Sequence, residues 1–232
     1  MSKTSHHLGV FAKYWEPGHV KTRLATAIGN ENAARLYREF ARQTLVRLGT
    51  SGQRRSLWIW PHERESEFRT LAGDSWEIRH QSDGNLGQRI STFFHSTLSG
   101  NSARHSPTHA VLVGTDAPTL DPQLIDDAFS TLDSCECVLG PSADGGYYLI
   151  GLTRHVPRLF KNIAWSSSRV LEQTRQRARE LGMTYCELPW FNDVDESSDL
   201  QELARQLESL THPSANDREL LSVIGQCSEQ RR

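Results

Sequence analysis

Two cations stand close together in the loop after the first apolar segment of the chain. Lys21 and Arg23 lie within EPGHVKTRL, where a proline and Gly18 mark a turn. A glycine lets the backbone approach a ligand, and Lys and Arg side chains bind phosphate oxygens; the Thr22 hydroxyl could add a donor. The segment is therefore a candidate phosphate loop, although a solvated turn with ordinary surface charges explains the same residues.

The best-known phosphate loop does not fit this segment. A Walker A loop requires G-x-x-x-x-G-K-[ST], but Val20 precedes Lys21 and the first glycine of the motif is missing. The segment is not a G-x-G-x-x-G fingerprint either. A P-loop NTPase is thereby disfavoured, while a different phosphate-binding loop stays open.

Carboxylates stand in two later loops. Asp116 ends the apolar run of VLVGTDAPTLDP, and Asp193 and Asp195 lie in WFNDVDESSDL. Because hard cations take oxygen ligands, Asp116 could hold Mg²⁺ or Mn²⁺ against a diphosphate, and the later pair could complete that site. The structural alternative is that Asp116 caps a turn and that the later pair caps the next helix, where Ser197 competes.

A third loop, in GPSADGGYYLIGL, carries Asp144, Gly145 and Gly146, a strong turn signal between two strands. By itself this pattern favours a hairpin. Taken together, the loops supply two cations, a strand-end aspartate and a second acidic pair. Phosphoryl or glycosyl transfer from a nucleotide needs this combination, with cations on the phosphates and a metal ion held by separated carboxylates.

Apolar periodicity predicts the elements that position these loops. Strand patterns occupy residues 8–14, 56–60, 76–81, 109–114, 137–140, 147–152 and 184–188, and helical patterns occupy 30–48, 63–71, 86–98, 122–132, 166–181 and 197–210. We expect Asn30 and Asp121 to cap two of these helices. The alternation predicts the α/β class, with a mostly parallel sheet covered by helices on both faces. Ligands then bind at the carboxyl ends of the strands.

The bulk composition fits a globular chain with small-molecule partners. The 232 residues are 37% hydrophobic and 23% charged, with a formal net charge of −2, so no global field attracts nucleic acid. No apolar run approaches the roughly 20 residues of a membrane span, and the N-terminus lacks a signal-peptide apolar region, so we expect a cytoplasmic protein. We expect a single domain over 1–232, with a core at about 8–210 and a tail at 211–232.

The cysteines do not form a recognisable metal motif. Cys135 and Cys137 form a C-x-C, but no second pair with metal-site spacing follows. We therefore expect reduced, mostly buried thiols rather than structural zinc.

Five segments together resemble a known family. FAKYWEPGHVKTRL, VLVGTDAPTL, GPSADGGYYLIGL, WSSSRVLEQT and DVDESSDL occur in the order seen in a bacterial glycosyltransferase-like family of the selenobiology- or radical-SAM-associated type. That family is part of the nucleotide-diphospho-sugar transferase (GT-A) superfamily, and is similar to the molybdenum-cofactor nucleotidyltransferases and phospholactate guanylyltransferases. The resemblance covers about residues 8–205.

The resemblance implies a Rossmann-like GT-A three-layer α/β/α sandwich that binds a nucleotide with Mg²⁺ or Mn²⁺. For the phosphates it implies Gly18, Lys21 and Arg23, and for the base and ribose Gln81 and Gly87. The metal ligands it implies are Asp116 and Asp195, with Asp193 as a close alternative. On the acceptor side it implies Asp144, Gly145 and Gly146, covered by Trp165 and Ser166. Asn85 and the turn at residues 196–198 depart from the family pattern.

The leading hypothesis is a metal-dependent transferase that moves a sugar from a nucleotide sugar to an acceptor. A metal ion at Asp116 and Asp195 would neutralise the leaving diphosphate, and Lys21 and Arg23 would stabilise the same developing charge. Asp144 would orient or deprotonate the acceptor hydroxyl. One alternative is nucleotidyl transfer from an NTP to a phosphorylated small molecule, with release of pyrophosphate. A second is a nucleotide-binding protein without catalysis.

Overall fold

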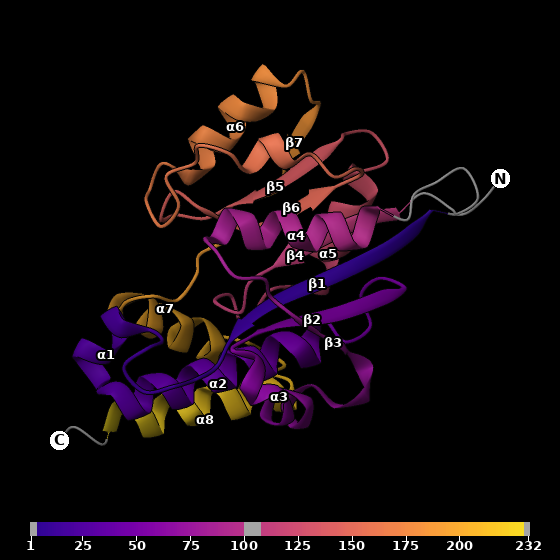
Figure 1. Cartoon of the computed structure of the whole chain (residues 1–232). Helices are drawn as coiled ribbons and strands as arrows, with labels where there is room; N and C mark the ends of the chain where they lie inside the picture. Colours follow the sequence, from indigo (N-terminus) through magenta and orange to yellow (C-terminus); the bar gives the residue numbers. More distant parts are fainter. Residues whose placement is uncertain (1–3, 100–107, 230–232) are drawn as a thin grey trace.

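The computed structural model describes residues 4–99 and 108–229, and seven strands in this part of the chain form one sheet (Figure 1). The order across the sheet is β3-β2-β1-β4-β6-β5-β7. The strands are β1 (Ser5–Lys13), β2 (Arg54–Trp60), β3 (Glu77–His80), β4 (Thr108–Val113), β5 (Cys137–Pro141), β6 (Tyr147–Leu152) and β7 (Tyr185–Glu187). Only β6 runs antiparallel to its neighbours, β4 and β5. The predicted α/β class with a mostly parallel, mixed sheet is confirmed.

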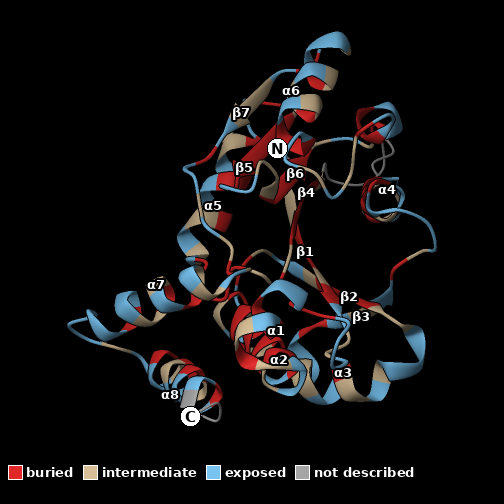
Figure 2. Cartoon of the chain, turned by 90° about the vertical axis from the view of Figure 1, so that its left-hand side faces the viewer, coloured by how far each residue is buried: buried red, intermediate tan, exposed pale blue. Residues whose placement is uncertain are grey.

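Helices cover both faces of the sheet. They are α1 (Thr22–Ile28), α2 (Asn30–Arg47), α3 (Glu65–Ala72), α4 (Leu86–Leu98), α5 (Pro122–Thr131), α6 (Val170–Glu180), α7 (Ser197–Glu208) and α8 (Ala215–Glu229), with short 3-10 turns at His62–Arg64, Gly73–Ser75 and Pro157–Phe160. Buried side chains of α2, α3 and α5 pack on one face, and those of α4 and α6 pack on the other. Figure 2 shows buried residues along the central strands and exposed residues on the outer sides of the helices. None of the helices in the described residues is long and apolar enough to cross a bilayer.

The centre of the sheet is where the strand order reverses. The chain leaves β1 towards β2 on one side and returns as β4 on the other side of β1. Strand β4 is buried along almost its whole length, as a central parallel strand covered on both faces must be. Open α/β sheets bind ligands at such a switch point, beyond the carboxyl ends of the strands. The loops after β1 and β4 carry Lys21 and Asp116.

Two helix starts differ from the sequence predictions. Gly29, with φ 84°, separates the unpredicted helix α1 from α2, and it occupies the N-cap position expected for Asn30. The helix expected from residue 166 begins at Val170, because Ser166 has a left-handed φ of 63° and Ser167 donates its hydroxyl proton to the Ala164 carbonyl. A residue in that conformation cannot continue a right-handed helix.

The cap predicted at Asp121 is confirmed, since its carboxylate accepts the Gln123 N–H at 2.9 Å. Further along the chain, the segment 211–232 contains α8, which packs against α2 and α7 with Leu220, Ile224 and Cys227 buried.

The cysteine prediction was wrong in one respect: Cys135 and Cys186 form a disulfide, while Cys137 and Cys227 are free and buried. The two bonded residues are 51 positions apart, so their spacing carries no signal. The parallel pairing of β5 with β7 aligns Val138 with Cys186 and thus brings the start of β5 to β7. Burial raises the pKa of Cys137 to about 12, which makes this thiol unreactive.

Candidate active site

Lys21 is the buried cation of the site. It stands at the N-cap of α1 with φ 47° and ψ 44°, a left-handed conformation that is costly for a residue with a Cβ. Its ammonium lies 2.5 Å from Oδ1 of Asp116 and 3.5 Å from Oδ1 of Asp195. The lysine side chain is 3% exposed, whereas the two carboxylates are 49% and 43% exposed. One cation is therefore shared by two carboxylates that face solvent.

Arg23 supplies the second cation, from the first turn of α1. Its guanidinium lies 3.2 Å from Oδ2 of Asp195 and 3.9 Å from Glu196, and the side chain is largely exposed. The carboxylate of Asp195 thus contacts Lys21 through one oxygen and Arg23 through the other.

The loop before α7 is fixed so that Asp195 faces these cations. Asp199 accepts the N–H groups of Asp195 and Glu196 at 3.0 and 2.8 Å, which caps the helix. The alternative, in which Asp193, Asp195 or Ser197 caps this helix, does not hold, because Glu196 occupies the N-cap position. The Asp195 carboxylate is consequently available for the site.

Asp193 lies on the same loop and lines the cavity described below. The Val194 N–H donates to the Asp116 carbonyl at 3.0 Å, which clamps this loop to the end of β4. Burial raises the pKa of Asp193 to about 6, and the nearby Asp144 and Asp116 carboxylates add to the shift while Lys21 opposes it. The site brings four carboxylates, from Asp116, Asp144, Asp193 and Asp195, together with two cations, Lys21 and Arg23.

The β5–β6 turn places a further carboxylate opposite this loop. Oδ1 of Asp144 accepts the Ser142 hydroxyl at 2.6 Å and the Gly146 N–H at 2.8 Å, which fixes the side chain. Gly145 has φ 85°, and a Cβ added there would overlap the backbone carbonyl of Ser168. The turn therefore packs directly against the serine segment before α6.

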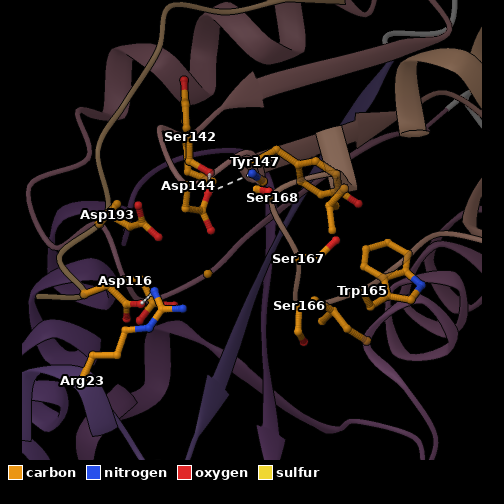
Figure 3. A pocket seen from close by; sticks show the side chains of 17 residues that line it. Arg23, Asp116, Ser142, Asp144, Tyr147, Trp165, Ser166, Ser167, Ser168 and Asp193 are labelled. Atoms are coloured by element: carbon orange, nitrogen blue, oxygen red, sulfur yellow. Dashed lines mark hydrogen bonds and ion pairs between the residues drawn. The ribbon is translucent and has the colours of Figure 1, made fainter. Parts of the chain in front are cut away.

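A cavity of about 590 Å³ lies among these loops (Figure 3). In this view Arg23, Asp116 and Asp193 lie on one side, and Trp165, Ser166 and Ser167 lie on the opposite side. A neighbouring cavity of about 270 Å³ shares several lining residues with it and extends over the ends of β1 and β4. Its lining is more apolar, with Phe11, Ile90 and Leu112. Most of the charged side chains thus line the larger cavity, while the smaller one shares Asp116 and adds Lys13.

The structure brings most of the predicted site residues to these cavities. The larger one is lined by Arg23, Asp116, Asp144, Gly146, Trp165, Ser166, Asp193 and Asp195. Lys21 lies beneath it, bonded to Asp116 and Asp195. Gln81 lines the smaller cavity, where its amide donates to the Ala12 and Trp58 carbonyls at 3.1 and 2.9 Å.

Besides Lys21, four predicted residues lie outside the lining of both cavities: Gly18, Thr22, Gly87 and Gly145. Gly87 is buried against the indole of Trp165, where a Cβ would overlap the ring. This glycine therefore seats the tryptophan that lines the cavity. Asn85, which departs from the family pattern, caps α4 through a capping box with Gln88.

Sequence reasoning missed several lining residues, namely Leu86, Ser142, Tyr147, Tyr148, Ser167 and Ser168. Their position in the sequence could have identified them, because most of them lie within the segments GPSADGGYYLIGL and WSSSRVLEQT that carry the resemblance. Periodicity assigned the two tyrosines to a strand, and the serines to a helix that begins later than expected.

The residues present fit a divalent cation that arrives with phosphates. The described residues contain no cluster of three or more Asp, Glu, His or Cys side chains arranged to hold a metal. Two carboxylates, Asp116 and Asp195, do converge on one point, the Lys21 ammonium. Mg²⁺ is usually held by one or two carboxylates together with substrate phosphates. The pair therefore suits a metal that enters with a nucleotide.

Comparison with known proteins gives the family context of this site. Residues 44–167 match the profile of a family described as an uncharacterized protein conserved in bacteria (DUF2064). A search of curated proteins found no match.

Solved structures share the fold over nearly the whole chain. A protein from Desulfovibrio desulfuricans G20, described as a candidate nucleotide-diphospho-sugar transferase, is 29% identical, with a TM-score of 0.85 over 97% of this chain and 99% of that one. The inositol-1-phosphate CTP transferase from T. maritima is 16% identical, with a TM-score of 0.54 over 97% and 98%. Rv0371C from Mycobacterium tuberculosis H37Rv, in complex with manganese, is 17% identical, with a TM-score of 0.50 over 89% and 100%.

The Desulfovibrio desulfuricans G20 protein agrees with the predicted transferase class, and all three structures agree with the Rossmann-like fold. The two structures of lower identity show the fold alone.

Proposed function

The chain belongs to the bacterial protein family DUF2064, and on that premise we propose that it is a metal-dependent glycosyltransferase with a nucleotide sugar as donor. The observation that carries the proposal is the Lys21 ammonium shared by Asp116 and Asp195. This cluster lies at the β1–β4 switch point, where folds of this class bind nucleotides.

The charges of the cluster are arranged so that Lys21 and the two carboxylates can exchange ion-pair partners when a ligand binds. A nucleotide diphosphate that binds alone is repelled by the Asp116 and Asp195 carboxylates, and a metal ion that binds alone is repelled by the Lys21 ammonium. When both enter together, the carboxylates of Asp116 and Asp195 take the metal ion while Lys21 and Arg23 take the phosphate oxygens. Metal and nucleotide should therefore bind cooperatively, each removing the repulsion that opposes the other.

Different parts of the donor are assigned to the two cavities. The smaller, more apolar cavity over the ends of β1 and β4 accommodates the base and ribose, with Gln81 in its wall. The larger cavity takes the diphosphate on the side of Arg23 and Asp116, and the sugar lies between that side and Asp144. The roles of Gly18 and Thr22 in this scheme are limited to the backbone path of the loop.

The proposed reaction is substitution at the anomeric carbon of the donor sugar. The acceptor hydroxyl oxygen forms the new bond, the bond to the diphosphate breaks, and a nucleoside diphosphate leaves. Asp144, whose Oδ1 is fixed by Ser142 and Gly146, takes the acceptor proton through its other oxygen. Lys21 and Arg23 stabilise the charge that develops on the leaving group, and a bound divalent cation supplies further positive charge there.

The product released from the donor tests this proposal. The protein is incubated with Mn²⁺ and either nucleotide sugars or NTPs, and nucleoside diphosphate and pyrophosphate are measured separately. Release of nucleoside diphosphate supports glycosyl transfer, and release of pyrophosphate would show nucleotidyl transfer instead. If no nucleotide, with or without Mn²⁺, raises the melting temperature, nucleotide binding itself is ruled out. Saturation at a hundred times Kd should add about 2.7 kcal/mol of stability.

A matched pair of variants separates the metal site from general effects of the loop. Asp116→Asn should weaken Mn²⁺-dependent nucleotide binding at least about tenfold, since it removes a charged ligand. Asp121→Asn, five residues later on the same loop, keeps a good N-cap and should leave that binding unchanged.

A further inference from the structure

We infer that the acceptor is an uncharged, hydroxyl-bearing molecule, a polyol or sugar, bound against Trp165 and the serines before α6, and not a phosphorylated compound. The inference rests on the proposed function, because it assigns the second substrate of the same cavity. It also goes further, since it selects between two kinds of acceptor that this fold can accommodate.

The distribution of charge around the cavity carries the argument. Four carboxylates line it, from Asp116, Asp144, Asp193 and Asp195, whereas Arg23 is the one cation in the lining that the described residues provide. Arg23 is already engaged by Asp195, on the side of the cavity away from Trp165. Lys21, beneath the cavity, is shared by Asp116 and Asp195. Both cations therefore serve the donor phosphates, and no lining cation is left for a second phosphate.

A phosphate on the acceptor would meet like charge. Proteins bind phosphate groups with Arg or Lys side chains or with clustered N–H groups. The lining residues beside Trp165 are instead uncharged, namely Tyr147 and the serines at 166–168, and the Asp144 carboxylate lies between them and the donor side.

The wall opposite the donor has the chemistry of polyol recognition. Trp165 is held in place by its packing on Gly87, and it presents a large aromatic surface to the cavity. Ser166, Ser167 and Ser168 follow it and also line the cavity, so polar groups adjoin the apolar surface, although the Ser167 hydroxyl donates to the Ala164 carbonyl. A polyol has C–H groups that pack on an aromatic ring and hydroxyls that bond to serine and carboxylate oxygens. No charge on the ligand is needed for either contact.

The orientation follows from the position of Asp144. Its carboxylate is fixed on the β5–β6 turn, and the same turn packs on the backbone of Ser168 through Gly145. A hydroxyl of a molecule resting on Trp165 is thereby directed towards both Asp144 and the donor side of the cavity (Figure 3). Trp165 and the serines act as binding residues, and Asp144 contacts the reacting hydroxyl.

The test compares neutral molecules with their phosphorylated forms. Glycerol, inositol and glucose, each paired with its monophosphate, are titrated into the full chain saturated with Mn²⁺ and a nucleoside diphosphate, and binding is measured by calorimetry. At least one neutral molecule should bind, and its monophosphate should bind at least about tenfold more weakly. Glucosamine tests a positively charged counterpart of glucose.

Three results would overturn the inference while leaving the donor assignment intact, because Mn²⁺-dependent nucleotide binding is measured first. One is that a monophosphate binds as tightly as its neutral partner. Another is that glucosamine binds more tightly than glucose. The last is that no neutral molecule binds although the nucleotide does. Failure of nucleotide binding would instead overturn the proposed function.

Two variants locate the contact. Trp165→Ala should weaken binding of the neutral acceptor at least about tenfold and leave nucleotide binding unchanged, as expected for loss of an aromatic contact. Trp190→Ala is the control, since this tryptophan is 60% exposed and lies outside the cavity lining. Asp144→Asn keeps an oxygen for the Ser142 and Gly146 bonds and removes one negative charge. It should therefore reduce the difference in affinity between each neutral molecule and its monophosphate. An unchanged difference in affinity would contradict the electrostatic argument.

Discussion

The Lys21 ammonium lies 2.5 Å from the Asp116 carboxylate, in an ion pair of which only the carboxylate reaches solvent. The lysine occupies the point on which Asp116 and Asp195 converge, so it opposes any cation that approaches the two carboxylates without a counter-anion. On the proposed function, we expect this pair to oppose the binding of a metal ion alone, and the phosphates of a nucleotide to relieve that opposition by attracting the ammonium.

Replacing that lysine should have opposite effects on the two ligands. Lys21→Met should raise the affinity for Mn²⁺ alone by about tenfold, because a like charge is removed, and should weaken nucleotide binding by a similar factor. Calorimetry of Mn²⁺ with and without nucleotide measures both changes. Lys161→Met, at an exposed lysine outside the cavity lining, is the control. A parallel loss of both affinities in Lys21→Met would contradict the exchange of partners.

Tyr37 ties together the two strand ends that carry the site. Its hydroxyl oxygen accepts the Lys13 N–H at 3.1 Å and the Thr115 hydroxyl at 2.9 Å, next to Asp116. Tyr37→Phe should cost about 1–2 kcal/mol of unfolding free energy, because both donors are left without their partner. It should also weaken nucleotide binding, since the loops after β1 and β4 lose a common anchor.

Urea unfolding and nucleotide titration check this expectation. Tyr185→Phe is the matched control, because its hydroxyl accepts only an exposed bond from Arg179. Equal effects of the two substitutions would show that the Tyr37 hydroxyl has no special role.

Gly145 tests the contact between the β5–β6 turn and the serine segment. Gly145→Ala introduces a Cβ that overlaps the Ser168 carbonyl, at a residue with φ 85°. Gly182→Ala introduces only the backbone penalty, because φ is 66° there and the space is open. The control, Gly182→Ala, should lose about 1 kcal/mol of unfolding free energy, and Gly145→Ala should lose at least about 1 kcal/mol more. Thermal unfolding measures both losses. If the two losses are equal, the turn does not rest on the serine segment as described.

His7 makes stability depend on pH. It is buried with its ring nitrogen 2.8 Å from the Ser56 hydroxyl, and burial together with Arg54 lowers its pKa to about 4. The unfolded chain therefore takes up the proton first as the pH falls. The contribution of His7 is fully present above about pH 6.5 and is lost progressively down to about pH 4, by up to about 3 kcal/mol.

Denaturant unfolding at pH 7.5, 6 and 5 checks this expectation, with about equal ionic strength at each pH. His7→Gln should have a flatter profile than the native chain across this range, while His109 and His155, whose pKa values are also lowered by burial, remain in both proteins. Superimposable profiles would rule out His7 as a source of the dependence.

Periodicity predicted the elements well wherever a long apolar pattern was present. The central strand expected at 109–114 is Thr108–Val113, and the cap expected at Asp121 is observed. Helix α1 was missed because it has only seven residues and ends at Gly29, directly before α2. The two helix starts that were predicted wrongly depend on the backbone dihedrals of Gly29 and Ser166, and the residue sequence does not reveal these dihedrals.

The sequence by itself determined which side chains are available to the site: the cations after β1, the strand-end carboxylate and the acidic pair before α7. It also determined the order of strands and helices, since each follows from local periodicity and turn residues. Only the tertiary structure decided that Lys21 meets both Asp116 and Asp195, that Trp165 rests on Gly87, and that Cys135 bonds to Cys186. These partners are far apart along the chain. Lys21 meets the two carboxylates because the crossovers of a parallel sheet bring the carboxyl ends of separate strands to one edge, and Cys135 meets Cys186 because β5 pairs with β7.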